Sequence, residues 1–488
     1  MNVVKERMKT VLLITLVLSS LFLTQVNLFD GLLISEGVTE EIEVHSTKLS
    51  MYINPQSYFV SFGGLSYTKV YDLKMQDNLW SEIRPFILSS FLNYESIEEI
   101  DREDYIKAFS DRSLLVRMPV DLSVSQFYSI FSDKVLSDGV ADITPREFLL
   151  REGNVRSLYV FDALSSKYYL MKHKTMQHDV GALIDAVRNI EIVDYRKLSD
   201  RFSLSSTLEG EDDKLNYELI PYQYDFIVSG IKVQNEVRMD DTYFNQDVSS
   251  ISGAVFGNRL DFVKKLKDVN DSIVLMYGYG DKSLTVSRTG NIAYRQKFNP
   301  QNSKSLTFKE AFSIAAGKLE NFGLMPEGIY LSNYEYDQSS KTYTFNFNYK
   351  LNSLSIAELD QSLDPIKIKV KENQVIAVDK NIKSFAGEYT PEKFMNSGRM
   401  FTIDECITNN IVEINVYYLQ DNGIQDSTLE KYKYYYKIVS EIKSIDLKYF
   451  EESDGNDSYM IPVWEVKISN RVYLFNAYDG KLIKTYIK

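Results

Sequence analysis

The side chains that most often carry chemistry do not form a recognised catalytic or metal-binding pattern in this chain. Its three histidines are His45, His173 and His178, and the last two are five positions apart. This spacing matches neither the His-Glu-x-x-His metal motif nor one face of a helix, on which residues recur every three or four positions. The sequence also lacks a Cys-x-x-Cys pair, a Walker loop and a Gly-x-Ser-x-Gly nucleophile motif. We therefore expect no catalytic residue, no metal and no cofactor, and hence a protein that is not an enzyme.

Three further segments match a chemical motif only in part. Residues 278–280, Gly-Tyr-Gly, lack the third glycine and the helix of a dinucleotide site, so they predict a turn. Residues 454–457 lack the spaced ligands and the final Glu of a calcium loop, and they predict a hairpin turn. The single cysteine, Cys406, lies at a predicted helix start and is expected to pack as a small apolar residue. Carboxylates are abundant, so an exported hydrolase that uses two of them stays an alternative.

Composition and charge exclude some partners and indicate the class of protein. The chain has 488 residues, a formal net charge of −13 and a pI near 5.0. An acidic surface repels phosphate backbones, so we expect no nucleic-acid partner. Hydrophobic residues make up 44% and charged residues 25%, which are globular values, and the length predicts about two or three domains. Alternating aromatic runs such as residues 343–349 predict half-buried strands.

The N-terminal region predicts a membrane anchor. Lys5, Arg7 and Lys9 precede a run without charge at residues 10–29. A helix rises about 1.5 Å per residue, so this run can cross a hydrocarbon core of roughly 30 Å. Because basic residues stay on the cytoplasmic side, residues 1–9 are expected in the cytoplasm, and residues 30–50 form a stalk outside a single-pass cell membrane protein. The alternatives are a cleaved signal peptide, although no small-residue cleavage site follows the apolar run, and a buried helix of a soluble protein.

Small polar residues on the predicted anchor suggest where it contacts another helix. Thr15 and Ser19 are four positions apart, as are Ser20 and Thr24, so each pair lies on one helix face. Small polar side chains at this spacing allow close approach and weak hydrogen bonds between membrane helices. These four residues are therefore the candidate partner-binding site, although a single span also tolerates Ser and Thr without a partner.

Patterns along the rest of the chain predict an α+β protein of antiparallel sheets with packed helices outside the membrane. We divide it into an N-terminal domain at 51–195, a middle domain at 196–384 and a C-terminal domain at 385–488. Apolar periodicity and turn residues predict helices at 77–93, 101–110, 123–132 and 180–190, and strands at 57–64, 67–72, 113–118, 157–162, 168–173, 272–279 and 284–297.

The last two units have a similar plan. Residues 306–311 align with residues 401–406, and in each a Thr precedes a Glu by three positions, just before an apolar run. This is the capping box that begins many helices, in which the Thr and Glu side chains bind each other's backbone amides. Each predicted helix is followed by β-rich sequence that ends in a hairpin. The similarity indicates an internal duplication, with chance similarity as the alternative.

Two segments, together with the anchor, resemble a known family. Residues 54–64, Asn-Pro-Gln-Ser-Tyr-Phe-Val-Ser-Phe-Gly-Gly, and the closing pattern of residues 462–480 resemble the YycH family of Gram-positive bacteria. The closing pattern also resembles the related YycI family and, more loosely, PepSY-like modules. The resemblance covers essentially the whole chain, although its motifs are structural and individually short.

The resemblance implies a regulatory function. Members of the YycH family have one transmembrane helix and an extracytoplasmic α+β region. Together with YycI, they bind and modulate the sensor histidine kinase (YycG or WalK) of an essential two-component system for cell-wall metabolism, largely through transmembrane helices. We expect this chain to act on such a kinase with a YycI-like partner, with inhibition as the expected direction. The alternatives are an exported cell-wall hydrolase and a ligand-binding or propeptide-like inhibitor module.

Overall fold

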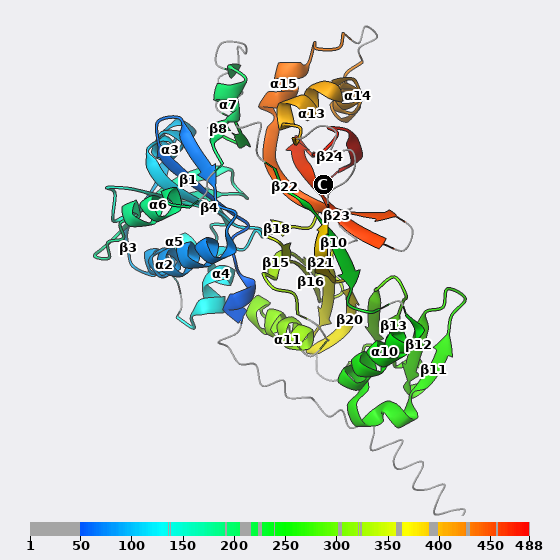
Figure 1. The fold of residues 1–488 in the computed structure, drawn as a ribbon. Helices are drawn as coiled ribbons and strands as arrows, with labels where there is room; N and C mark the ends of the chain where they lie inside the picture. Colours follow the sequence, from blue (N-terminus) through cyan, green and yellow to red (C-terminus); the bar gives the residue numbers. More distant parts are fainter. Residues whose placement is uncertain are drawn as a thin grey trace, which may run out of the picture. The chain divides into compact units, whose positions relative to one another are not determined.

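Figure 1 shows a computed structural model of the chain, in which residues 49–487 are described with internal gaps. The predicted cytoplasmic tail, the anchor at 10–29 and all but the end of the stalk lie outside the described residues. None of the helices in the described part is both long and apolar enough to cross a membrane. The gaps are 135, 137, 191–192, 205–215, 223–226, 239, 301–304, 321, 323–324, 358–363, 390–398, 426–429 and 455–456.

The first sheet has nine antiparallel strands in the order β3-β7-β6-β5-β4-β1-β2-β8-β9. Alternation along β1 sends Tyr58 and Val60 into one core and Phe59 into a second, because successive side chains point to opposite faces. The strands are β1 (Ser57–Gly63), β2 (Ser66–Lys69), β3 (Tyr94–Ile100), β4 (Arg112–Arg117), β5 (Pro145–Arg151), β6 (Ser157–Asp162), β7 (Lys167–His173), β8 (Tyr195–Lys197) and β9 (Leu219–Pro221).

Helices cover both faces of the first sheet. The helix α2 packs against β3 and β7, α6 packs against β1 and β4, and α3 packs on the other core. The helix α2 begins at Leu73, four residues before the prediction, because the Asp72 side chain caps it by accepting the Met75 N–H at 2.7 Å. The helices are α2 (Leu73–Leu92), α3 (Arg102–Ser110), α4 (Val124–Phe131), α5 (Asp138–Ala141), α6 (Gly181–Arg188) and α7 (Leu198–Arg201), and the single turn η1 (Leu49–Tyr52) precedes β1.

The second sheet has eight strands in the order β11-β12-β13-β14-β20-β19-β16-β15. The helix α11 packs against β16, β19 and β20, and α10 packs against β13. The elements are α10 (Asp241–Phe256), η2 (Gly257–Phe262), β11 (Lys264–Lys267), β12 (Ile273–Tyr277), η3 (Gly278–Gly280), β13 (Lys282–Val286), β14 (Ile292–Gln296), α11 (Phe308–Glu320), β15 (Tyr330–Asp337), β16 (Thr342–Asn348), β19 (Ile366–Lys371) and β20 (Gln374–Lys380), beside the small hairpin of β17 (Lys350–Leu351) and β18 (Leu354–Ser355).

The third sheet is built around a long hairpin of β22 and β23. The strands of this sheet follow the order β21-β10-β23-β24-β25, and β22 pairs with β23 alongside this order. The strand β23 is long enough to pair with β10 near one end and with β24 near the other. The elements are β10 (Gly230–Asn235), β21 (Lys383–Tyr389), α13 (Ile403–Asn409), α14 (Ile411–Asp421), α15 (Tyr435–Ser440), β22 (Ile442–Asp454), β23 (Asp457–Ile468), β24 (Arg471–Asn476) and β25 (Leu482–Ile487).

The predicted α+β class and the similar plan of the last two units are confirmed. In each unit a capped helix start precedes four strands that pair in sequence order, β15-β16-β19-β20 and β22-β23-β24-β25. The Thr307 N–H donates to Glu310 at 2.8 Å, and the Thr402 N–H donates to Glu405 at 2.9 Å. Cys406 is buried, as predicted.

Sheet membership does not follow the linear order of the chain. The first sheet takes β8 and β9 from residues at and beyond 195, and the third sheet combines β10 with strands near the C-terminus. Which strands pair over such sequence distances depends on which sheet edges meet in three dimensions. A local sequence pattern does not determine that pairing. The domain boundaries drawn at 195 and 384 stay predictions.

Candidate functional site

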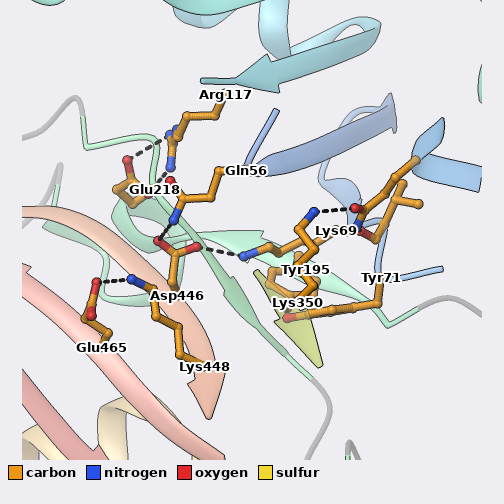
Figure 2. A network of polar contacts seen from close by, with 12 residues as sticks. Gln56, Lys69, Tyr71, Arg117, Tyr195, Glu218, Lys350, Asp446, Lys448 and Glu465 are labelled. Atoms are coloured by element: carbon orange, nitrogen blue, oxygen red, sulfur yellow. Dashed lines mark hydrogen bonds and ion pairs between the residues drawn. The ribbon is translucent and has the colours of Figure 1, made fainter. Parts of the chain in front are cut away.

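Polar side chains from the first sheet, the β17–β18 hairpin and the third sheet meet around Asp446 (Figure 2). The strand β22 positions this residue, because alternation places Ser444, Asp446 and Lys448 on one face. Opposite Asp446 on the neighbouring strand lies Glu465. Charged side chains are rarely buried unless they are paired, so such a face predicts partners from another element.

Asp446 receives one donor from Lys69 in β2 and another from Gln56, the residue before β1. Lys69 Nζ lies 2.8 Å from one carboxylate oxygen, and Gln56 Nε2 donates to the other at 3.3 Å. The side chains of Lys69 and Asp446 are only 9% and 12% exposed. Burial alone would raise the pKa of the Asp446 carboxyl, but the positive charges of Lys69 and Lys448 outweigh it and hold the pKa well below its usual range. Asp446 therefore stays ionised and links β22 to the first sheet.

Arg117 organises a second group of ion pairs beside Asp446. Its guanidinium donates two bonds to Glu218, at 2.9 and 3.0 Å, and a third to Glu147 at 2.8 Å. Glu147 lies opposite Arg117 in the β4–β5 pair, and its second oxygen accepts the hydroxyls of Tyr105 and Tyr217. This fork geometry matches the planar guanidinium to carboxylates.

One guanidinium neutralises only one of the two buried carboxylates that it binds, and the pKa of Glu218 is raised. Burial raises the pKa of the Glu218 carboxyl to about 7, with Glu147 and Asp446 adding repulsion, while Arg117 offsets part of the rise. Near neutral pH this group therefore exchanges a proton.

Lys350 connects the β17–β18 hairpin to the same region. Its Nζ donates to Gln76 Oε1 at 2.6 Å, and the Gln76 amide donates to the Val70 carbonyl. Burial lowers the pKa of Lys350 to about 8, and the nearby charge of Lys69 adds to the effect. The hairpin is thus attached to α2 and the first sheet through a lysine that loses part of its charge above neutral pH.

An open cleft of about 940 Å³ lies beside the network. Its walls include Arg117 and Glu147 from the first sheet, Glu218 directly before β9, and Asp446 and Lys448 from β22. The lining combines these charged side chains with tyrosine rings and with apolar residues such as Phe161 and Val472, so the cleft suits a polar ligand that also carries apolar groups.

The histidines of the described part lie elsewhere, in a packing role. His173 Nε2 bonds the Ser89 hydroxyl at 2.8 Å, and the rings of His173 and His178 pack on Phe86. Burial lowers the pKa of both imidazoles below their ordinary value. Within the described ranges, no group of three or more His, Cys, Asp or Glu side chains has the geometry of a metal site.

Comparison with solved structures gives the fold a known counterpart. The crystal structure of YycH from Bacillus subtilis aligns over 89% of this chain and 96% of its own, with a TM-score of 0.50 and 13% identity. The fold is YycH-like. An uncharacterized protein from Eubacterium rectale aligns over 54% of this chain and 88% of its own, with a TM-score of 0.34 and 11% identity. No protein-family model and no curated protein matches the sequence.

The residues that the sequence predicts as the site are not the residues of the polar network that the structure shows. The predicted contact residues Thr15, Ser19, Ser20 and Thr24 lie outside the described residues. The charged network went unpredicted because its members are far apart in the chain; Gln56 and Asp446 are separated by 390 positions. One local signal existed, namely charges inside otherwise apolar strands, such as Glu465 between Trp464 and Val466.

Proposed function

We propose that this chain is a membrane-anchored, extracytoplasmic regulator of a sensor histidine kinase of the YycG or WalK type. It acts together with a YycI-like partner, lowers the kinase's activity and performs no catalysis of its own. The observation that carries the proposal is the likeness of fold to YycH over nearly the full length of both chains. The sequence resemblance at residues 54–64 and 462–480 supports the same assignment independently of the fold.

The mechanism we propose is differential binding by the predicted anchor at residues 10–29. A partner that packs better against one signalling state of the kinase shifts its equilibrium by the difference in binding free energy and by no more. Thr15, Ser19, Ser20 and Thr24 offer the close helix contacts for this. A coupling of about 1–3 kcal/mol changes the kinase equilibrium roughly 5–150-fold.

The extracytoplasmic part has a mechanical role in this proposal. The ion pairs around Asp446 join the first sheet to the third across hundreds of residues of sequence. A rigid connection of this kind transmits a change at one sheet to the other instead of absorbing it in a flexible joint. In this proposal the extracytoplasmic domains set how the anchor is presented to its partner.

The test uses the full chain in membranes with the sensor kinase and a YycI-like protein. We expect both to co-purify with the native chain, and kinase autophosphorylation in nanodiscs to fall when the chain is present. The variant Thr15→Leu/Ser19→Leu/Ser20→Leu/Thr24→Leu keeps the span apolar but removes the small polar faces. It should lose both effects, whereas the matched exchange Leu16→Ile/Leu23→Ile should keep them.

Two outcomes would contradict parts of the proposal. Full regulation by a chain whose residues 10–29 are replaced with an unrelated apolar helix would overturn the helix mechanism. Recovery of neither partner with any version would overturn the kinase assignment. The exported hydrolase and the propeptide-like inhibitor would then be the hypotheses to screen.

A further inference from the structure

The cleft beside the polar network has a deep part and a rim of opposite charge. Its lining includes six charged side chains that are at most 13% exposed. Four of these are carboxylates and two are cations, and Lys69 behind Asp446 supplies a third cation. The deep charged residues are Arg117, Glu147, Glu218, Asp446, Lys448 and Glu465. These six residues, which form the floor of the cleft, together with Lys69 carry one more negative than positive charge when all of them are ionised.

The rim of the cleft has the opposite balance. Its more exposed lining residues include the cations Arg102, Arg146, Lys443 and Lys467 against two acids, Asp121 and Glu441. A wholly anionic ligand would meet the carboxylate floor, and a polyamine would meet the cationic rim. A ligand that carries an ammonium group and a carboxylate satisfies both layers.

Glu218 lies where the floor has its excess of negative charge. The groups that face it are Arg117 from β4, Glu147 from β5 and Asp446 from β22. Its raised pKa means that a proton offsets part of this excess near neutral pH. An ammonium group placed over the floor would take the proton's place and favour the ionised carboxylate. Binding of such a group should therefore release protons.

We propose that this cleft binds a short peptide with free termini, with the ammonium group over the floor at Glu218 and the carboxylate at the rim near Arg146 and Lys467. The cleft volume of about 940 Å³ lies within the range of roughly 300–1,000 Å³ that is usual for ligand sites. Tyr168, Tyr217 and Phe161 in the lining offer apolar surface to the peptide's side chains. This site goes beyond the proposed kinase regulation and does not depend on it.

The first test is calorimetry with trialanine and the purified full chain in nanodiscs, with empty nanodiscs as the blank. We expect saturable binding at pH 7 that weakens at least tenfold when the peptide is N-acetylated, and likewise when it is C-amidated. The heat should differ between buffers of different ionisation enthalpy, because protons are released. All-L and all-D trialanine separate the sources: an L preference indicates protein-derived peptides, and a D preference indicates wall peptides.

Variants of the chain make the test specific to the cleft. Glu218→Gln keeps an acceptor for Arg117 but removes the charge, so binding should weaken about tenfold and proton release should disappear. Lys467→Gln at the rim should weaken trialanine but leave the C-amidated peptide unchanged. Arg295→Gln removes an exposed cation of β14, outside the cleft, and should change nothing.

Clear results would overturn the proposal. One is that neither all-L nor all-D trialanine binds saturably to a folded chain. The other is that the free and the N-acetylated peptide bind equally well. If Glu218→Gln does not fold, the rim variant Lys467→Gln and the modified peptides still decide the question. None of these measurements involves the kinase, so failure here and failure of the proposed function are distinguishable.

Discussion

Replacing Asp446 with Asn should destabilise the protein strongly, although it removes only one charge. In the native structure the Lys69 ammonium is 9% exposed and has the Asp446 carboxylate as its anion at 2.8 Å. The amide that replaces the carboxylate can still accept a hydrogen bond but cannot neutralise the charge. The variant Asp446→Asn therefore leaves a buried ammonium without a counter-ion.

The size of the loss follows from the burial of both partners. Removing one partner of a buried ion pair costs about 3–5 kcal/mol, because the remaining charge stays desolvated. Since the amide oxygen retains a hydrogen bond to Lys69, we expect the lower end, about 3 kcal/mol of unfolding free energy. Replacing both partners, as Lys69→Met/Asp446→Leu, removes the unpaired charge and should recover most of that loss.

The two tryptophans provide the assay. Trp80 in α2 is 4% exposed and reports on the first sheet, whereas Trp464 in β23 is 3% exposed and reports on the third. Urea unfolding is followed in Trp80→Phe and Trp464→Phe backgrounds, each with and without Asp446→Asn. Both probes should record the loss, because the Lys69–Asp446 pair belongs to both sheets.

A matched control and a refuting result complete this prediction. Glu99→Gln breaks the exposed pair with Lys167, whose side chains are 55% and 47% exposed, and it should leave the unfolding midpoint unchanged. A loss below about 1 kcal/mol for Asp446→Asn would show that the Lys69 charge is compensated by other groups. A double variant Lys69→Met/Asp446→Leu that is as unstable as the sum of the single variants would refute the pairing argument.

Three further predictions follow from the buried titratable groups. The pKa of Glu218 is raised from 4.5 to about 7, which corresponds to about 3 kcal/mol of stability. This stability is present below pH 4.5 and is lost as the pH rises to 7, so Glu218→Gln should flatten this part of a stability-against-pH curve measured by urea unfolding. The pKa of Lys350, lowered from 10.5 to about 8, has the opposite effect, so stability should rise between pH 8 and 10.5, and Lys350→Met should abolish that rise. Cys406 is fully buried and burial raises the pKa of its thiol, so a thiol reagent should label the chain only at the rate of unfolding, and faster labelling in native buffer would contradict its place in the core.

Local patterns were sufficient to predict many elements. The strand β6 was predicted with its bounds, and α3, α4 and α6 were predicted to within two residues at each end. These elements have strong periodicity or a clear N-cap, which are properties of neighbouring residues. The strand β2 and helix α2 were placed with a shifted boundary, because the capping role of Asp72 was not recognised.

Two of the strands that went unpredicted show what a local pattern misses. The strand β11, Lys264–Lys267, is exposed at every position and therefore has no apolar alternation. The strand β10 lies more than 200 positions from β23, with which it pairs, so its pairing depends on the arrangement of the third sheet. Neither property is visible in a window of ten residues.

By itself, the sequence determined the acidic charge, the α+β class, the capped helices of the last two units, the burial of Cys406 and the apolar run at residues 10–29. Each of these depends on composition or on residues within a few positions of one another, so short-range physics is enough. The tertiary structure alone decided that Lys69, Arg117, Glu218 and Asp446 share one buried network beside a cleft. Ion pairs between residues hundreds of positions apart form only after the sheets have brought them together, and burial then sets their pKa values. The charges inside apolar strands indicate that some side chains need partners, but they do not say which residues those partners are.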